Sequence, residues 1–456
     1  MKTRRNLTEL CLLTAVLLHA LTSVAQPIIK VAAGGSHSLF LKSDGSLWAM
    51  GFNGNGQLGD GTYNDTNRPE QVVPNGVLAI SGGSYHSLFM KTNGSLWAMG
   101  KNLSGELGDG TYATNFPYGT NRAEQVVASN VTAIATGGDH SLFLKTTNSL
   151  WGMGWNQYGQ LGDGSYNQTN LPEQIIVASN VTAIASKGEH SLFLKNDGSL
   201  WAMGANSYGQ LGDGSYNNTN KPEQIVASNI MAIATGYFHS LFLKNDGSLW
   251  GMGFNYYGQL GDGTYTTIYP YGITHPKQII ASNVTAIAAG DYHSLFLKSD
   301  GSLWAMGGNG SGQLGDGTTN SVNRPEQIVA SSVTAIAAGA VQSLFIKSDG
   351  SLWAMGANNY GQLGDGTTNN IIYPKQVVAG PPGYNLISGQ LLSGSKMQLS
   401  FMGITGAKYA LDRSSSLASP NWLPQATNPA NSLGALIFTN TPNPATNNFW
   451  RIRSVP

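Results

Sequence analysis

The sequence is poor in cysteine and in charge. Its one cysteine, Cys11, lies in an apolar run near the N-terminus, so no disulfide can form within the chain and stability must come from packing. Charged residues make up 11% of the 456 residues, with 24 basic and 24 acidic side chains. Clustered lysines and arginines of the kind that bind nucleic acid are missing, so we expect no nucleic-acid partner.

Long apolar runs are also missing. The longest, Leu10 to Leu21, is too short for a comfortable membrane span, so we expect no membrane span. It follows three basic residues and precedes the small residues Ser23 to Ala25, which is the pattern of a signal peptide. We therefore predict a signal peptide at residues 1–25 and a protein that is secreted or held at the exterior of the cell envelope. The mature chain would carry 21 basic and 23 acidic residues, a net charge of about −2.

What the sequence has is a repeat of about fifty residues. A Leu-Trp pair recurs seven times, and eleven residues before each Trp stands an anchor residue, six times His and once Gln. A period of this length indicates a solenoid, a propeller or an array. The tryptophans are Trp48, Trp97, Trp151, Trp201, Trp250, Trp304 and Trp353, and the anchors are His37, His86, His140, His190, His239, His293 and Gln342.

Each repeat predicts four short antiparallel strands. In the sixth copy these are VTAIAAG from Val284, HSLFLK from His293, SLWAMG after the hairpin Asp300-Gly301, and a strand around Pro325 to Val329. Asn148 replaces the hairpin glycine in the third copy, as expected where φ is positive. The strands are apolar on both faces, so each sheet is expected to lie between two neighbours.

Seven such repeats predict an all-β fold, a seven-bladed β-propeller over residues 26–379. Helical repeats are excluded because helical periodicity is absent, and a β-helix would not need hairpins. A linker, 380–384, contains Gly380-Pro381-Pro382-Gly383. Residues 385–456 alternate apolar and polar positions and predict a small β-sandwich-like domain; alternatively, its first strand closes the propeller.

The strings GxxHSLF, DGSLWAMG and NxxGQLGDG resemble the repeats of the regulator of chromosome condensation family, over roughly residues 27 to 380. The resemblance implies a seven-bladed propeller. The eukaryotic founder of the family is a guanine-nucleotide exchange factor on chromatin. In its predicted export, this chain is more similar to the bacterial propeller-type β-lactamase inhibitory proteins, which bind their target through one face.

Alternating strand direction sorts the loops between two faces. The Asp-Gly hairpins and the Ala-Ser-Asn turns share one face and are nearly identical in all copies. The turn before each anchor and the loop after each third strand share the other, which we call the variable face. Aromatic and acidic residues on this face predict a binding surface for a protein or a glycan. The predicted ligand-binding residues are Tyr85, Asp139, Trp155, Tyr158, Glu189, Tyr208, Phe238, Phe254, Tyr256, Tyr257 and Tyr292. Alternatively, the aromatic residues only cover the glycine-rich loops.

Two insertions fall on the variable face, Phe116-Pro117-Tyr118-Gly119 in the second copy and Tyr269-Pro270-Tyr271-Gly272 in the fifth. Three blades apart, they would stand about 150° from each other, like two jaws. Inheritance from a duplicated block of three repeats explains their spacing equally well.

Three groups of residues that resemble chemical sites also have structural explanations. The anchor histidines sit on separate blades and one copy has Gln342, so we expect structural hydrogen bonds and no metal site. Asp139 and Glu189 occupy equivalent positions in adjacent repeats near Trp155, which leaves glycoside chemistry as an alternative. The seven Gly-Asp-Gly triplets are typical of turns and lack the ligand spacing of an EF-hand.

The sequence thus favours an exported, monomeric, non-catalytic binding protein that needs no cofactor. The alternatives are an inhibitor of a secreted enzyme, a carbohydrate-active enzyme, and a nucleotide exchange factor, the last by family analogy alone.

Overall fold

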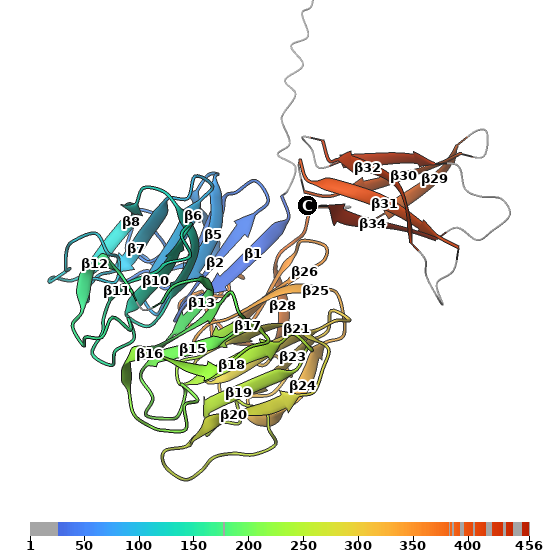
Figure 1. The fold of residues 1–456 in the computed structure, drawn as a ribbon. Coiled ribbons are helices and arrows are strands. Elements are labelled where there is room, and N and C mark those ends of the chain that lie inside the picture. The colour runs from blue at the N-terminus through green and yellow to red at the C-terminus, as the bar shows by residue number, and fades with distance from the viewer. Residues whose placement is uncertain are drawn as a thin grey trace, which may run out of the picture.

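The computed structural model describes residues 26–455 except 177, 383, 385–386, 393–395, 405, 416–421, 432–434 and 441–448. The predicted signal peptide lies outside the described residues. Seven four-stranded antiparallel sheets are arranged around an axis, and two three-stranded sheets form a separate C-terminal domain beside them (Figure 1). The predicted all-β fold is confirmed, and the strands repeat seven times as the sequence indicated.

The blades follow the repeats in order, four consecutive strands each. Blade one is β1 (Ile28–Ala33), β2 (His37–Lys42), β3 (Leu47–Gly51) and β4 (Thr66–Val73). Blade two is β5 (Val77–Gly82), β6 (His86–Lys91), β7 (Leu96–Lys101) and β8 (Gly119–Val127). Blade three is β9 (Val131–Thr136), β10 (His140–Lys145), β11 (Leu150–Gly154) and β12 (Thr169–Gln174). Blade four is β13 (Val181–Lys187), β14 (His190–Lys195), β15 (Leu200–Gly204) and β16 (Thr219–Val226).

The remaining blades repeat the pattern. Blade five is β17 (Ile230–Thr235), β18 (His239–Lys244), β19 (Leu249–Phe254) and β20 (Gly272–Ile280). Blade six is β21 (Val284–Ala289), β22 (His293–Lys298), β23 (Leu303–Gly307) and β24 (Val322–Val329). Blade seven is β25 (Val333–Ala338), β26 (Gln342–Lys347), β27 (Leu352–Gly356) and β28 (Ile371–Val378). The first strand of every blade is innermost and contacts the first strands of its neighbours.

The blades are held together by two differently shaped apolar faces. In blade one, Phe40 and Met50 pack against blade seven, whereas Leu39 and Leu41 pack against blade two. The same pairing of a Phe/Met face with a Leu/Ala face recurs at all seven interfaces. This explains why the second and third strands are apolar on both sides, since each sheet lies between two others.

The ring closes without exchanging a strand between the first and last repeats. Each four-stranded sheet is drawn from one repeat, and blades one and seven share an apolar cluster like the other interfaces. The amide of Ile28 donates to the carbonyl of Gly350, and Ser38 Oγ donates to the carbonyl of Gln362. Closure therefore depends on side-chain packing and on a few hydrogen bonds between the first and last blades.

The six anchor histidines form hydrogen bonds between blades. The Nε2 atom of each lies 2.8 or 2.9 Å from the Oγ of the serine that follows the next anchor, as in His37 and Ser87. Ser87 Oγ donates to the carbonyl of Gln57, so it accepts from His37 Nε2–H. In the seventh copy the side chain of Gln342 donates to the carbonyl of Gly34. The predicted structural role of the anchors is therefore what the structure shows.

Burial sets the protonation state of this ring. All six histidines are inaccessible to solvent, and burial lowers the pKa of each to about 3. The imidazoles are therefore neutral at physiological pH, and the hydrogen bond to the serine places the one ring proton on Nε2.

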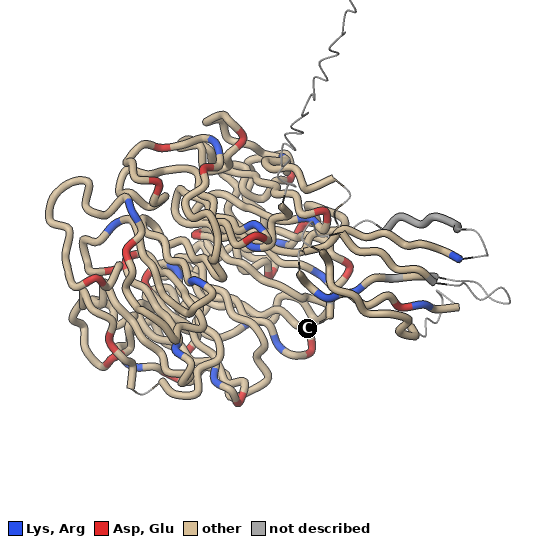
Figure 2. The backbone as a smooth tube through the Cα atoms, turned by 90° about the horizontal axis from the view of Figure 1, so that it is seen from above, with Lys and Arg blue, Asp and Glu red and all other residues tan. Residues whose placement is uncertain are grey.

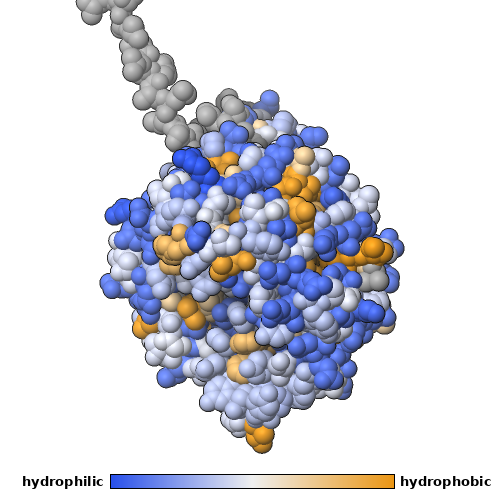
Figure 3. All heavy atoms as spheres, turned by 90° about the vertical axis from the view of Figure 1, so that its left-hand side faces the viewer, coloured by the Kyte–Doolittle hydropathy of each residue, from blue (hydrophilic) through white to orange (hydrophobic). Residues whose placement is uncertain are grey.

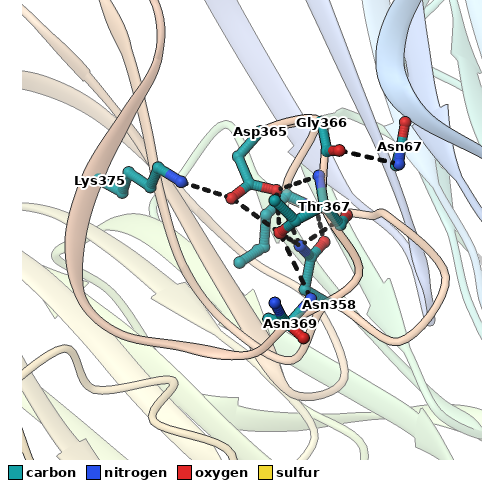
Figure 4. Close-up of polar contacts among 8 residues, drawn as sticks. Asn67, Asn358, Asp365, Gly366, Thr367, Asn369 and Lys375 are labelled. Atoms are coloured by element: carbon teal, nitrogen blue, oxygen red, sulfur yellow. Dashed lines mark hydrogen bonds and ion pairs between the residues drawn. The ribbon is translucent and has the colours of Figure 1, made fainter.

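The loop after each third strand is closed by its Gly-Asp-Gly aspartate. In blade seven, Asp365 Oδ1 accepts from the amide of Thr367 and from the side-chain amide of Asn358 (Figure 4). Lys375 Nζ lies 2.6 Å from the other carboxylate oxygen. Across the interface, Asn67 donates to the carbonyl of Gly366, so the loop also joins blade seven to blade one. These aspartates act as turn-closing residues, as the sequence suggested.

On the hairpin face, every blade carries the same stack of side chains. Lys42 Nζ lies 3.9 Å from the centre of the Trp48 ring, and Phe40 stacks on that ring from the neighbouring strand. Trp48 Nε1 donates to Ser46 Oγ. The hairpin glycine has the predicted positive φ, 76° at Gly301, and Asn148 adopts 55° in its place.

The C-terminal domain consists of sheets β29-β30-β33 and β32-β31-β34. The strands are β29 (Ile387–Leu392), β30 (Lys396–Met402), β31 (Lys408–Ser414), β32 (Leu423–Pro429), β33 (Ala435–Asn440) and β34 (Phe449–Val455). Leu399, Phe401, Tyr409 and Leu411 contribute to its core. Because β29 pairs with β30, the alternative in which this segment's first strand closes the propeller is wrong.

Charges and apolar groups are spread thinly over the surface. Basic and acidic residues are scattered and intermixed along the backbone (Figure 2). From the side shown in Figure 3, hydrophobic residues form several separate patches on a mostly hydrophilic surface. Within the described residues, no helix has the length and apolar character needed to cross a membrane.

Closure by packing leads to the first prediction. Met50 is completely buried at the interface between blades one and seven. Replacing it with alanine removes packing atoms and leaves a cavity, so we expect M50A to lower the free energy of unfolding by about 2–5 kcal/mol in urea titrations. The control is M231A, because Met231 is 51% exposed. Equal effects of the two changes would contradict closure by packing.

The buried histidines lead to a second prediction. The pKa of His293 is lowered from 6.5 to about 3, so the unfolded chain binds its proton first and stability falls as pH drops below 6.5. In H293Q, which copies the residue of the seventh repeat, this loss should be smaller by about 1.4 kcal/mol per pH unit between pH 6 and 4. Urea midpoints against pH measure it, with exposed His275→Gln as the control. An unchanged slope in H293Q would show that the ring histidine does not titrate in this way.

Candidate binding face

The two loop sets of the variable face are joined directly by backbone hydrogen bonds. The amide of Trp155 donates to the carbonyl of Asp139 at 2.8 Å, and that of Phe254 donates to Phe238. On the opposite face, the amide of Val77 donates to the carbonyl of Gly45 and so joins a hairpin to an inter-blade turn. The turn before each anchor and the loop after the third strand therefore share one face, as predicted from strand direction.

Nine aromatic residues on blades four to six form one continuous group, which we call the aromatic cluster. Neighbouring rings lie 4.5–6.3 Å apart and most meet edge to face, a favourable geometry. Phe254 is the buried centre, whereas Tyr256 and Tyr257 are 44% and 38% exposed. The members are Tyr208, Tyr237, Phe238, Phe254, Tyr256, Tyr257, Tyr269, Tyr271 and Tyr292.

The other predicted aromatic residues lie outside this cluster. Tyr85 joins a smaller group with Phe52, which also contacts Tyr360 of blade seven. Trp155 is partly buried and Tyr158 is 37% exposed, and neither makes a ring contact with the other described aromatic residues. The structure thus brings together six of the predicted site residues and leaves Tyr85, Trp155 and Tyr158 apart from them.

The two insertions have the same backbone conformation. Both contain a cis X-Pro bond, and the tyrosine after the proline has φ 63° in each. The carbonyls of Tyr118 and Tyr271 accept from the backbone amides of Asn102 and Asn255. The tips are prominent, with Phe116 75% and Tyr269 72% exposed. Tyr269 and Tyr271 belong to the aromatic cluster, whereas Phe116 and Tyr118 contact each other, so the two insertions are alike in conformation and unlike in surroundings.

Acidic residues gather on the variable face at blades two to four. Lys101 Nζ forms an ion pair with Asp139 Oδ1 at a distance of 2.7 Å. Glu106, completely buried, stands where the other copies have glutamine, and its Oε1 lies 4.0 Å from Lys101 Nζ. Burial and the charge of Asp139 raise the pKa of Glu106 to about 7. Asp139 is thus engaged by lysine, which does not favour a role as a catalytic carboxylate beside Glu189.

Three residues that were not among the predicted ligand-binding residues lie around the axis. Lys187 stands where the other copies have glycine three positions before the anchor, and its Nζ donates to the carbonyl of Ala338 at 2.7 Å. In those other copies, a Cβ added to the glycine would lie 2.2–2.5 Å from the anchor side chain that follows it. This explains why the other six copies have glycine at this position. Tyr237 and Asp291 stand two positions before their anchors. All three were visible as departures from the repeat.

The carboxylates and Tyr237 influence one another. Burial and the charge of Asp139 raise the pKa of Glu189, and burial raises the pKa of Asp291. Burial is the main cause of the raised pKa of Tyr237, and the charges of Glu189, Asp291 and Asp139 raise this pKa further. No group of three metal-ligating side chains occurs in the part of the chain that the structure describes.

Sequence profiles place the chain in a known family. The profile of the RCC1-like domain matches residues 14–331, and two profiles of the regulator of chromosome condensation (RCC1) repeat match residues 333–362 and 349–388. The first match alone covers more than half of the chain. The protein therefore belongs to the RCC1-like family of β-propellers, whose members mostly regulate or bind other molecules.

Solved structures agree with this assignment. Human WBSCR16 is 27% identical, with a TM-score of 0.62 over 69% of this chain and 85% of its own. Prp20p from Saccharomyces cerevisiae is 20% identical, with a TM-score of 0.66 over 79% of this chain and 88% of its own, and its structure was described with its binding to Gsp1p and histones. Yeast RCC1 (Prp20) bound to Kap60 matches at the same score and identity, over 80% of this chain and 87% of its own. These similarities support the fold.

Glu106 leads to a third prediction. With its pKa raised from 4.5 to about 7, the folded state holds this proton more tightly, so stability falls as pH rises from 4.5 through 7. The variant E106Q should match the parent near pH 5 and exceed its unfolding free energy by about 2–3 kcal/mol at pH 8.5. Urea titrations at both pH values measure the difference. A constant difference across this range would contradict the assignment, and the exposed Glu223→Gln is the control.

Proposed function

We propose that this protein is exported and acts as a non-catalytic binding protein whose variable face docks a protein partner. The observation that carries the proposal is the aromatic cluster, which lies on the face where the repeats differ. The opposite face repeats the same lysine, tryptophan and serine arrangement in every blade. A rigid ring that keeps one face constant and varies the other is suited to binding.

The chemistry of the cluster favours a protein partner over a glycan. Tyrosines dominate it, and their rings combine apolar area with a hydroxyl at low entropic cost, as in antibody binding sites. Edge-to-face packing occupies many ring faces, which leaves fewer flat platforms for stacking on a sugar. Export is supported by the N-terminal sequence, with its basic start, short apolar run and small residues before Gln26.

Inhibition of a secreted enzyme is one form this function could take, because it needs only tight binding through one face. Nucleotide exchange is disfavoured, since it requires a cytosolic GTPase and conflicts with the proposed export. Turnover of a carbohydrate is disfavoured by the ion pair between Asp139 and Lys101.

The test is a binding screen of residues 26–456 against panels of purified extracellular proteins and of glycans. We expect a protein ligand whose affinity falls at least tenfold, about 1.4 kcal/mol, in the double variant Y256A/Y257A. The control is Y373A, because Tyr373 is 61% exposed and lies on the outer strand β28. Equal binding by both variants would remove the aromatic cluster from the site, and a glycan ligand with no protein ligand would overturn the choice of partner.

A further inference from the structure

Around the axis, each blade contributes the residue two positions before its anchor to the variable face. Two backbone hydrogen bonds join members of this set directly: the amide of Gly138 donates to the carbonyl of Gly188 at 2.6 Å, and that of Asp291 donates to Ala340. The central channel of a propeller opens where these residues lie, and we call this place the mouth. The members of the set are Gly35, Ser84, Gly138, Gly188, Tyr237, Asp291 and Ala340, and we call the set the axial ring.

Three polar groups lie at this mouth without a partner in the part of the chain that the structure describes. Among the described residues, the carboxylates of Glu189 and Asp291 and the hydroxyl of Tyr237 make no hydrogen bond or ion pair. All three side chains are partly buried. Unpaired carboxylates in such surroundings are costly, and burial accordingly raises the pKa of both.

The wall of the mouth is aromatic. The Tyr237 and Phe238 rings lie 4.5 Å apart, and Phe238 lies 6.1 Å from Tyr292, so the aromatic cluster extends to the axial ring. Carboxylates beside aromatic faces are the combination that binds an organic cation, through ion pairs and through attraction to the ring faces.

The lysines nearby are already engaged. Lys101 pairs with Asp139, and Lys187 reaches from blade four to the carbonyl of Ala338 in blade seven. Lys187 and Asp291 influence each other electrostatically, but the described residues show no ion pair between them, and burial lowers the pKa of Lys187. Among the described residues, Glu189 has no ion pair. Two carboxyl groups without an ion pair therefore face the mouth, which disfavours an anionic ligand.

We propose that the mouth of the channel is a socket for a basic side chain, lysine or arginine, presented by the protein that docks on the variable face. The inference rests on the proposed function and adds the chemistry of the contact. The inserted ammonium or guanidinium donates hydrogen bonds to Glu189 and Asp291, while the rings of Tyr237, Phe238 and Tyr292 enclose its stem.

The test uses small peptides in place of the unidentified partner. Residues 26–456 are titrated calorimetrically with acetyl-Gly-X-Gly-amide, where X is arginine, lysine, norleucine or glutamate. We expect the arginine and lysine peptides to bind with a Kd of about 1 mM or tighter at low salt, and the norleucine and glutamate peptides at least tenfold more weakly. Binding should weaken at 0.15 M salt because part of it is electrostatic.

Two variants make the test specific. E189Q/D291N should lose at least tenfold in affinity for the cationic peptides, about 1.4 kcal/mol, while E326Q on the outer strand β24 should bind like the parent. K187M should bind them more tightly, because a positive charge near Asp291 is removed. Equal binding of the norleucine peptide, no binding of any peptide, or an unaffected E189Q/D291N would each overturn the socket.

The outcome is separable from that of the proposed function. A protein partner that is lost by Y256A/Y257A but retained by E189Q/D291N leaves the docking face standing and removes the socket. A partner retained by both variants removes both.

Discussion

The fold depends on the interface between successive blades. Each interface has an interlocked apolar layer and an anchor side chain that donates to the next blade. At six interfaces this anchor is a histidine that donates to a serine, and the serine donates in turn to a backbone carbonyl of the previous loop, as Ser87 does to Gln57. None of these contacts is strong alone. Repeated seven times around a closed ring, they leave each sheet no freedom to tilt without breaking contacts on both sides. A chain without disulfides obtains its rigidity in this way.

That constraint divides the molecule into a fixed part and a free part. Positions that build the interface cannot vary, which is why the second and third strands are almost identical in all seven copies. Backbone hydrogen bonds join the turn before the anchor to the loop after the third strand, so the side chains of both are free to differ between copies. The departures collect there: Lys101 and Glu106 in blade two, Lys187 and Glu189 in blade four, Tyr237 in blade five.

Most of the fold could be predicted from the sequence. Period, hairpin residues and strand patterns give the blades, and strand direction gives the two faces, because these are local properties repeated many times. The fourth strand of blade six was predicted around Pro325 but begins at Val322, since its pairing with Gly307 is fixed by the partner strand and not by its own apolar pattern.

The candidate site could be predicted only in part. Its face and six members of the aromatic cluster followed from self-comparison. Which rings meet did not, because Tyr208 of blade four contacts Phe238 of blade five, and such contacts depend on how neighbouring blades are rotated. Nor could sequence show that Lys187 crosses the axis to Ala338, or that Asp139 is paired with Lys101 while Glu189 is not. All of these contacts join different blades, and the sequence does not give the distances between blades.

The most direct test of binding through the variable face is the hydrogen-exchange footprint of a bound protein partner on residues 26–456. We predict new protection at the turns preceding His190, His239 and His293 and in the loop of residues 254–272, with no change at the Asp-Gly hairpins. Protection confined to the hairpin face or to the C-terminal domain would contradict the assignment of binding to the variable face.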